Sequence, residues 1–183
     1  MKNLIKLLIF TSFLFSNDSQ GQNPELFASK SGFGFTVGSS SSGNLLTNLL
    51  SSTMNIISPT YYAVIPINGG KVEPSIGYFG MSEGENSINM TSLGLGLLKN
   101  SFSNENIKSY GGIRGSYMMI TATDQDSESI MSFSAVTGAE YFFNNNFSIG
   151  GESRLTYIKP NDNSDLSMRS LDSVLFFRFY LKD

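Results

Sequence analysis

Two stretches near the end of the chain decide the fold: FSIGGESRLTYIK from Phe147 to Lys159, and SVLFFRFYL from Ser173 to Leu181. The large apolar side chains that alternate through these stretches share one parity, namely Phe147, Ile149, Leu155, Tyr157, Leu175, Phe177 and Phe179. The charges between them share the other parity, namely Glu152, Arg154 and Arg178. Successive side chains of a β-strand point to opposite faces, so both stretches predict strands with one apolar and one ionic face.

The composition narrows the class of protein. The chain has 183 residues, 15% charged and 13% aromatic, with no His and no Cys and a net charge of −3. This length predicts one domain, and the missing residue types remove disulfides, thiol chemistry and imidazole chemistry. The chain has no Lys/Arg cluster, which gives no footprint for nucleic acid. We expect no catalytic residues, no metal site and no cofactor.

The first residues resemble an export signal. Lys2 and Lys6 precede the short apolar run 7–15, and the small residues Ser19 and Gly21 bracket a cleavage point. The run is too short to span a bilayer as a helix, which needs about 20 residues. We therefore expect residues 1–21 to be a signal peptide and residues 22–183 to form the mature domain.

The alternation recurs along that domain and predicts eight antiparallel strands. The strong hairpin signal Asn68-Gly69-Gly70 separates the second strand from the third, and Asn144-Asn145-Asn146 separates the sixth from the seventh. The leucines within 44–52 have helical spacing, which predicts a short helical turn in the first loop. The expected strands are 31–38, 54–67, 71–81, 87–98, 106–121 and 129–143, followed by one before and one after a loop at 159–167. Eight such strands can close into an up-and-down barrel.

Eight charged residues within these strands fall on the polar parity and form the predicted charge set: Glu73, Lys108, Arg114, Glu140, Glu152, Arg154, Asp172 and Arg178. Four acids balance four bases, and glycines occur between them on the same parity. An eight-stranded barrel has room inside only for packed side chains, and buried charges must pair. We expect the charge set to fill the interior and to join the strands to one another through ion pairs. An ion path, or a ligand site at the barrel mouth, are the functional alternatives.

Aromatic residues predict where a membrane interface would lie. They flank the Asn144–Asn146 turn and recur near the chain end: Tyr141, Phe142, Phe143, Phe147, Phe177, Phe179 and Tyr180. Outer-membrane barrels carry such girdles at both interfaces. With the N-terminus in the periplasm, the outward loops are 39–53, 82–86, 123–128 and 159–167. The last three of these loops contain seven acidic residues and one lysine, Lys159.

The last strand carries a family resemblance. Its alternating hydrophobic residues Leu175, Phe177, Phe179 and Leu181 resemble the closing strand of bacterial outer-membrane β-barrels, which the barrel-assembly machinery recognises. With the signal peptide and strand count, the domain resembles the small outer-membrane barrels of the OmpX and OmpA transmembrane-domain type. The chain ends in Leu181-Lys182-Asp183, whereas those barrels often end on an aromatic residue.

The resemblance implies an all-β, antiparallel, eight-stranded transmembrane barrel in the cell outer membrane. We expect a monomeric, non-enzymatic protein that contacts outer-membrane lipid and the assembly machinery, with an envelope-structural or surface-interaction role through loops whose partner is unknown. The alternative is a secreted or periplasmic soluble barrel that binds an apolar ligand, with Phe33, Leu93, Phe133, Leu155 and Phe177 lining its cavity.

Overall fold

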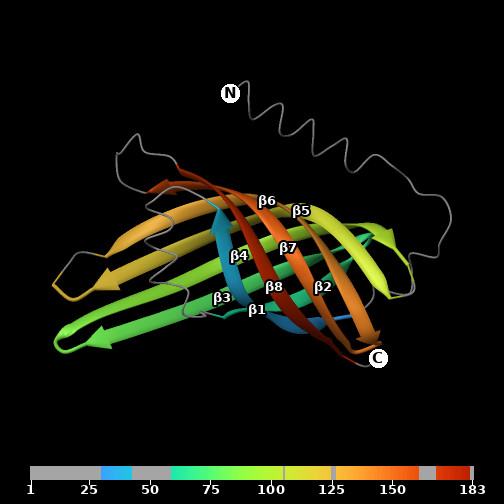
Figure 1. Ribbon diagram of the computed structural model, residues 1–183, viewed down its shortest axis with the longest axis horizontal. Helices are drawn as coiled ribbons and strands as arrows, with labels where there is room; N and C mark the ends of the chain where they lie inside the picture. Colours follow the sequence, from blue (N-terminus) through green and yellow to red (C-terminus); the bar gives the residue numbers. More distant parts are fainter. Residues whose placement is uncertain (1–29, 43–58, 105, 125–126, 161–167, 182–183) are drawn as a thin grey trace, which may run out of the picture.

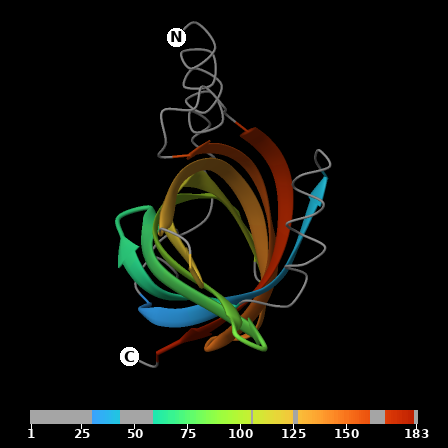
Figure 2. The ribbon, with the colours of Figure 1, turned by 90° about the vertical axis from the view of Figure 1, so that its left-hand side faces the viewer.

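The protein is a closed antiparallel β-barrel of eight strands in up-and-down order. The computed structural model describes residues 30–42, 59–104, 106–124, 127–160 and 168–181. Figure 1 shows the barrel from the side and Figure 2 along its length. The strands are β1 (Gly32–Ser42), β2 (Thr60–Ile67), β3 (Gly70–Glu83), β4 (Asn86–Ser103), β5 (Ile107–Ala122), β6 (Glu128–Asn144), β7 (Phe147–Pro160) and β8 (Met168–Tyr180). Within these residues no helix is long and apolar enough to cross a membrane.

Alternate connections lie at the same end of the barrel, as antiparallel order requires. One end, which we call the terminal end, holds both ends of the described barrel, since Leu181 donates a backbone hydrogen bond to Ser31 over 2.8 Å. The short β2–β3, β4–β5 and β6–β7 turns lie at this end, at the right of Figure 1. The opposite end, the loop end, carries the β3–β4 and β5–β6 connections. Gly69 has a φ of +73°, which explains why the predicted Asn68-Gly69 turn needs glycine.

Closure joins β1 to β8. Gly32 pairs with Tyr180 and Ser42 with Leu171, with a register shift between Val37 and Ser39. A closed barrel has no unpaired edge strand, which removes the usual route to edge-to-edge aggregation. The predicted fold class, an eight-stranded antiparallel up-and-down barrel, is confirmed.

Several strand limits differ from the sequence-based expectation. The polar segment 99–105 was expected to be a connection, but β4 continues to Ser103 because its backbone goes on pairing with β5 as far as Lys108. Likewise β1 extends to Ser42 by pairing with β8. The expected signal peptide, the helical turn at 44–52 and the start of the second strand at 54–58 lie outside the described residues.

The barrel wall separates two kinds of side chain. Glu73 and Arg178 on the inner face have no exposed surface, whereas Tyr78 and Phe133 on the outer face are 63% and 62% exposed. The parity predicted from the sequence therefore holds around the barrel, with the ionic face turned inward. A small apolar cluster accompanies the charges inside, formed by Tyr62, Val64, Leu98, Tyr110, Val136 and Phe176.

Candidate functional site

A continuous chain of ion pairs crosses the barrel interior. It begins at Arg154, whose Nε lies 2.6 Å from Glu152 Oε1. Arg114 Nη2 bridges Glu152 Oε2 and Glu73 Oε2, at 2.8 and 2.7 Å. Arg178 then joins Glu73 to a third carboxylate described below. Six of the eight predicted residues belong to this chain, which we call the charge network: Glu73, Arg114, Glu140, Glu152, Arg154 and Arg178.

Arg178 occupies the centre of this network. Its two terminal nitrogens lie 2.7 Å from Glu73 Oε1 and 2.5 Å from Glu140 Oε2. Its guanidinium carbon also lies 4.1 Å from the centre of the Phe176 ring, in cation–π range. The planar guanidinium on β8 thus binds one carboxylate from β3 and another from β6. The ammonium group of a lysine, which is a point charge, could not bind both with the same geometry.

Lys71 also belongs to the charge network, although it was not in the predicted set. Its Nζ lies 3.1 Å from Glu140 Oε2 and 3.6 Å from Glu73 Oε1. The sequence did indicate that Lys71 lies on the inner face, because it has the same parity as Glu73 two residues later. It stands next to the β2–β3 turn, where a lysine looks like an ordinary solvated residue.

Hydroxyl groups complete the coordination of the carboxylates. Ser148 Oγ donates to Glu140 Oε1 over 2.7 Å, and the Tyr180 hydroxyl donates to the same oxygen. Tyr110 donates to Glu152 Oε2 over 2.9 Å. Tyr180 was missed as a member of the network because it was assigned to the membrane interface. Tyr110 shares the polar parity of Lys108 and Arg114, but the predicted set contained only charged side chains.

Two predicted residues lie apart from this chain of ion pairs. Within the described part of the chain, Asp172 accepts hydrogen bonds from Ser170 and Thr156, at 2.9 and 3.2 Å. Lys108 lies nearer the terminal end with its ammonium 4.1 Å from the Phe142 ring centre. The described residues contain no group of three or more acidic side chains placed to hold a metal ion.

Interior glycines make room for the long side chains of the network. An added Cβ at Gly96 would lie 2.5 Å from Arg114 Nη1. At Gly138 it would lie 2.6 Å from the Tyr110 ring carbon Cζ and 2.8 Å from the Gly151 carbonyl oxygen. The close approach of charged and aromatic groups to the wall therefore explains these glycines. It also means that the described interior is packed with side chains at this level.

We expect Gly138→Ala to lower the free energy of unfolding by about 1–3 kcal/mol, the usual effect of overpacking. The new methyl group must displace the buried Tyr110 ring, whose hydroxyl binds Glu152. Gly115→Ala is the matched control, because its Cβ would meet only the Phe133 ring, at 3.7 Å. That variant should match or exceed the parent by up to about 1 kcal/mol. Urea unfolding of the refolded barrel measures both, and equal values would contradict the packing argument.

The aromatic residues near the terminal end divide between the two faces. Tyr141, Phe143, Phe147, Phe177 and Phe179 lie outside in a connected row, with ring centres 5.1 Å apart for Phe147 and Phe179. The expectation for Phe142 and Tyr180 was wrong. They lie inside, with ring centres 5.5 Å apart, because they share the parity of Glu140 and Arg178.

The outer face also carries cations near the strand ends. With the strands longer than expected, Lys99, Lys159 and Arg169 fall on the apolar parity and are exposed. Lys99 lies toward the terminal end, and the other two lie toward the loop end.

The predicted assembly residues of the last strand occupy the outer face. Leu175 and Leu181 are exposed, and Phe177 and Phe179 stack on Phe35 and Phe33, with centre distances of 5.2 and 5.3 Å. They form part of the seam where β8 closes onto β1. Their recognition by the assembly machinery stays a prediction.

Comparison with solved structures defines the class of fold. The chain is similar to Neisserial surface protein A (NspA), with a TM-score of 0.55, 17% identity, and 83% of this chain and 96% of that chain covered. The N-terminal barrel domain of Pseudomonas aeruginosa OprF gives a TM-score of 0.48 at 13% identity, covering 82% and 97%. Yersinia pestis Ail gives 0.44 at 15%, covering 83% and 97%.

The comparison rests on the similarity to NspA, and at 17% identity this similarity shows the fold alone. The chain has the fold of the small eight-stranded outer-membrane barrels, so the resemblance predicted from its last strand is confirmed at that level. No family model matches the sequence, and no curated protein matches it.

Proposed function

We propose that the chain is a non-enzymatic integral protein of the outer membrane of a bacterium with two membranes. Its barrel is the membrane anchor, and the loop end acts in envelope structure or surface interaction. The observation that carries this proposal is the inversion of the barrel, which has hydrophobic side chains outside and ion pairs inside.

The outer wall has the chemistry of a lipid-facing surface. Exposed hydrophobic residues occur on all eight strands, including Phe33, Ile65, Ile76, Leu95, Ile113, Phe133, Leu155 and Leu175. Soluble monomers rarely expose contiguous apolar patches above a few hundred Å², whereas a transmembrane barrel needs an apolar band around its circumference. Each of β3 to β8 has at least 13 residues, more than the roughly 9–11 that a tilted crossing requires.

The alternative of a soluble barrel with an apolar ligand inside fits the geometry poorly. Phe33, Leu93, Phe133 and Leu155 are exposed on the outer face, and Phe177 shares that face. The inner face instead presents the charge network. A cavity for an apolar ligand would need the opposite arrangement of these two sets.

Two observations favour a non-enzymatic role. The chain has no His and no Cys, which are common catalytic bases and nucleophiles. The interior carboxylates of Glu73, Glu140 and Glu152 are held by Arg and Lys side chains rather than directed at an open site.

The acidic side chains of Glu85, Asp124 and Glu128 are exposed at the loop end, which favours contact between this end and the surroundings of the cell.

Fractionation of the expressed full chain tests the membrane assignment. We expect it to remain in the membrane pellet after sodium carbonate extraction and to migrate differently on a gel before and after heating, because the closed barrel resists detergent until it is melted. Release by carbonate would contradict the proposal. A monomeric product refolded without detergent would favour the soluble alternative.

A further inference from the structure

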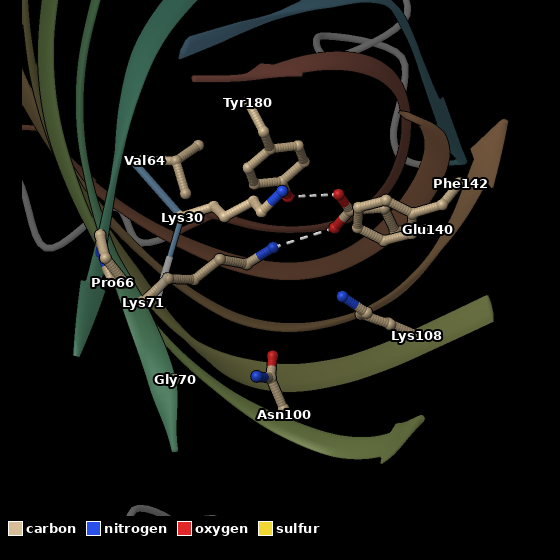
Figure 3. Close-up of a pocket in the computed structure, with 10 residues that line it drawn as sticks. All are labelled: Lys30, Val64, Pro66, Gly70, Lys71, Asn100, Lys108, Glu140, Phe142 and Tyr180. Carbon is tan, nitrogen blue, oxygen red and sulfur yellow. Dashed lines mark hydrogen bonds and ion pairs between the residues drawn. The ribbon is translucent and has the colours of Figure 1, made fainter. Parts of the chain in front are cut away.

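The barrel interior changes in chemistry from one end to the other. Toward the terminal end it is polar, and the Glu140 carboxylate binds Lys71 and Tyr180 there (Figure 3). Beyond the charge network lies a belt of hydroxyl groups, in which Ser134 contacts Thr156 over 2.9 Å. Closer still to the loop end, the inward side chains of β3 to β7 become apolar. The interior therefore ends in an apolar layer.

These apolar side chains form one surface, which we call the loop-end inner face: Phe79, Met90, Met118, Ile120, Ile130 and Ile158. Each has the inward parity of its strand. Backbone pairing sets Met90 opposite both Phe79 and Ile120, and it sets Met118 opposite Ile130. Met90 is buried, and the other five side chains are partly exposed. The face is therefore continuous over neighbouring strands, and the protein covers it only in part.

The outer face of the same strand segments is mostly polar. Its side chains include Asn89, Thr91, Thr121, Ser129, Lys159 and Arg169. The Tyr78 hydroxyl also donates a hydrogen bond to Asn89 Oδ1 over 3.0 Å on this face. Near the loop end the two faces thus exchange their chemistry, compared with the wall around Leu95. Apolar inside and polar outside is the arrangement of a water-soluble barrel, and eight-stranded barrels of that kind can hold one small ligand.

The charges at this end of the barrel favour a cation. Glu128 has the inward parity of β6 and lies directly opposite Ile120 of the loop-end inner face. Its side chain is exposed, as are those of Glu85 and Asp124 at the same end. Lys159 and Arg169, by contrast, lie on the outer face. The described groups at the inner rim are therefore acidic, and a ligand with a positive charge complements them.

We propose that the loop-end inner face binds a cationic amphiphile with one alkyl chain, whose ammonium group lies beside Glu128. The alkyl chain covers the partly exposed apolar side chains and removes their surface from water. The interior of an eight-stranded barrel is narrow, which suits one unbranched chain. Met90 and Met118 adapt to its shape, because methionine is unbranched and flexible. The site concerns the inner face alone, so it stands or falls separately from the membrane assignment, which the carbonate extraction tests.

NMR of the full barrel in nanodiscs of zwitterionic lipid, with ¹³C-labelled methionine methyl groups, tests the site. The probe is hexyltrimethylammonium at a constant ionic strength of about 0.15 M, which holds general screening fixed. We expect saturable shifts at Met90 and Met118, weaker binding of the neutral hexanol, and no saturable shift with tetramethylammonium, which lacks the alkyl chain. Met119 and Met131 are the internal controls, because they lie on the outer face and are 45% and 47% exposed. Their signals report partition of the probe into lipid.

Matched variants separate the inner face from the rest of the loop end. Ile120→Asn should weaken binding of hexyltrimethylammonium by about fivefold or more, because it replaces apolar surface that the alkyl chain covers. Thr121→Asn places the same side chain on the outer face of β5 and should change binding by less than about twofold. Glu128→Gln should weaken binding of the cation by about two- to fivefold and leave hexanol binding unchanged. The heat-dependent gel shift verifies that each variant still forms a closed barrel.

Four results would overturn the proposal. The first is a shift at Met119 and Met131 as large as that at Met90 and Met118, which would show partition into lipid only. The second is tighter binding of hexanol or of the anion hexanesulfonate than of the cation. The third is binding that occurs only after residues 44–57 are replaced by a Gly/Ser linker, which would show that the chain itself covers this face. The fourth is a shift that follows the barrel concentration without the probe, which would indicate a second copy.

Discussion

Replacing Arg178 with methionine is expected to lower the free energy of unfolding by about 3–5 kcal/mol, the usual effect of breaking a fully buried ion pair. The substitution keeps a long side chain but leaves Glu73 and Glu140 without the cation that joins them at 2.7 and 2.5 Å. Arg178→Lys should fall between the parent and Arg178→Met, because one ammonium cannot reproduce the forked contact. Urea unfolding in detergent micelles, followed by the heat-dependent gel shift, measures the difference.

Two variants control this prediction. Arg169→Met removes an exposed arginine from the same strand and should change stability by less than about 1 kcal/mol. Adding Glu140→Gln to Arg178→Met should recover part of the loss, since it removes one of the two buried carboxylates that lost their shared arginine and leaves Lys71 to pair with Glu73. A loss from Arg178→Met no larger than that from Arg169→Met would show that the network does not hold the barrel together.

Placing an arginine on the middle of the outer wall should be almost as damaging. Leu95 lies near the centre of β4 and is 50% exposed on the outer face. In a bilayer, Leu95→Arg should lower the stability of the folded barrel by about 2–4 kcal/mol, because a charge at the midplane of the lipid must be hydrated or displaced. Unfolding from lipid vesicles gives this value directly.

The control for this experiment is the same kind of change close to the terminal end. Ile67 is also exposed on the outer face, but it lies beside the β2–β3 turn. Ile67→Arg should cost only about 0–1 kcal/mol, since an arginine near the interface reaches water. Small and equal effects at Leu95 and Ile67 would contradict a wall buried in lipid.

The period-two pattern predicted the barrel well because strand faces are a local property. Glu152 and Arg154 have the opposite parity to Leu155, and in a strand parity determines which side of the wall a side chain occupies. The partners within the interior are not local. Arg178 meets Glu73, more than a hundred residues earlier, only because the barrel closes, and no spacing in the sequence encodes that distance.

The errors have the same origin. Lys99 and Asn100 looked like a loop because polar residues dominate there, yet backbone pairing with β5 continues past them. Phe142 and Tyr180 were assigned to the interface by residue type, although their parity placed them inside. Where residue type and parity disagreed, parity was the better guide, because the pleat fixes side-chain direction more strictly than hydrophobicity does.

The seam between β1 and β8 links the closure of the barrel to the completion of the charge network. β8 brings Arg178 into the interior and, in the same movement, supplies the last rows of backbone partners to β1. Before that strand docks, Glu73 and Glu140 lack their shared arginine, so an unclosed sheet keeps its acids hydrated. Removal of water from the interior and closure of the barrel therefore belong to one cooperative step. A barrel that lacks only its last strand is expected to have little of the stability of the closed one.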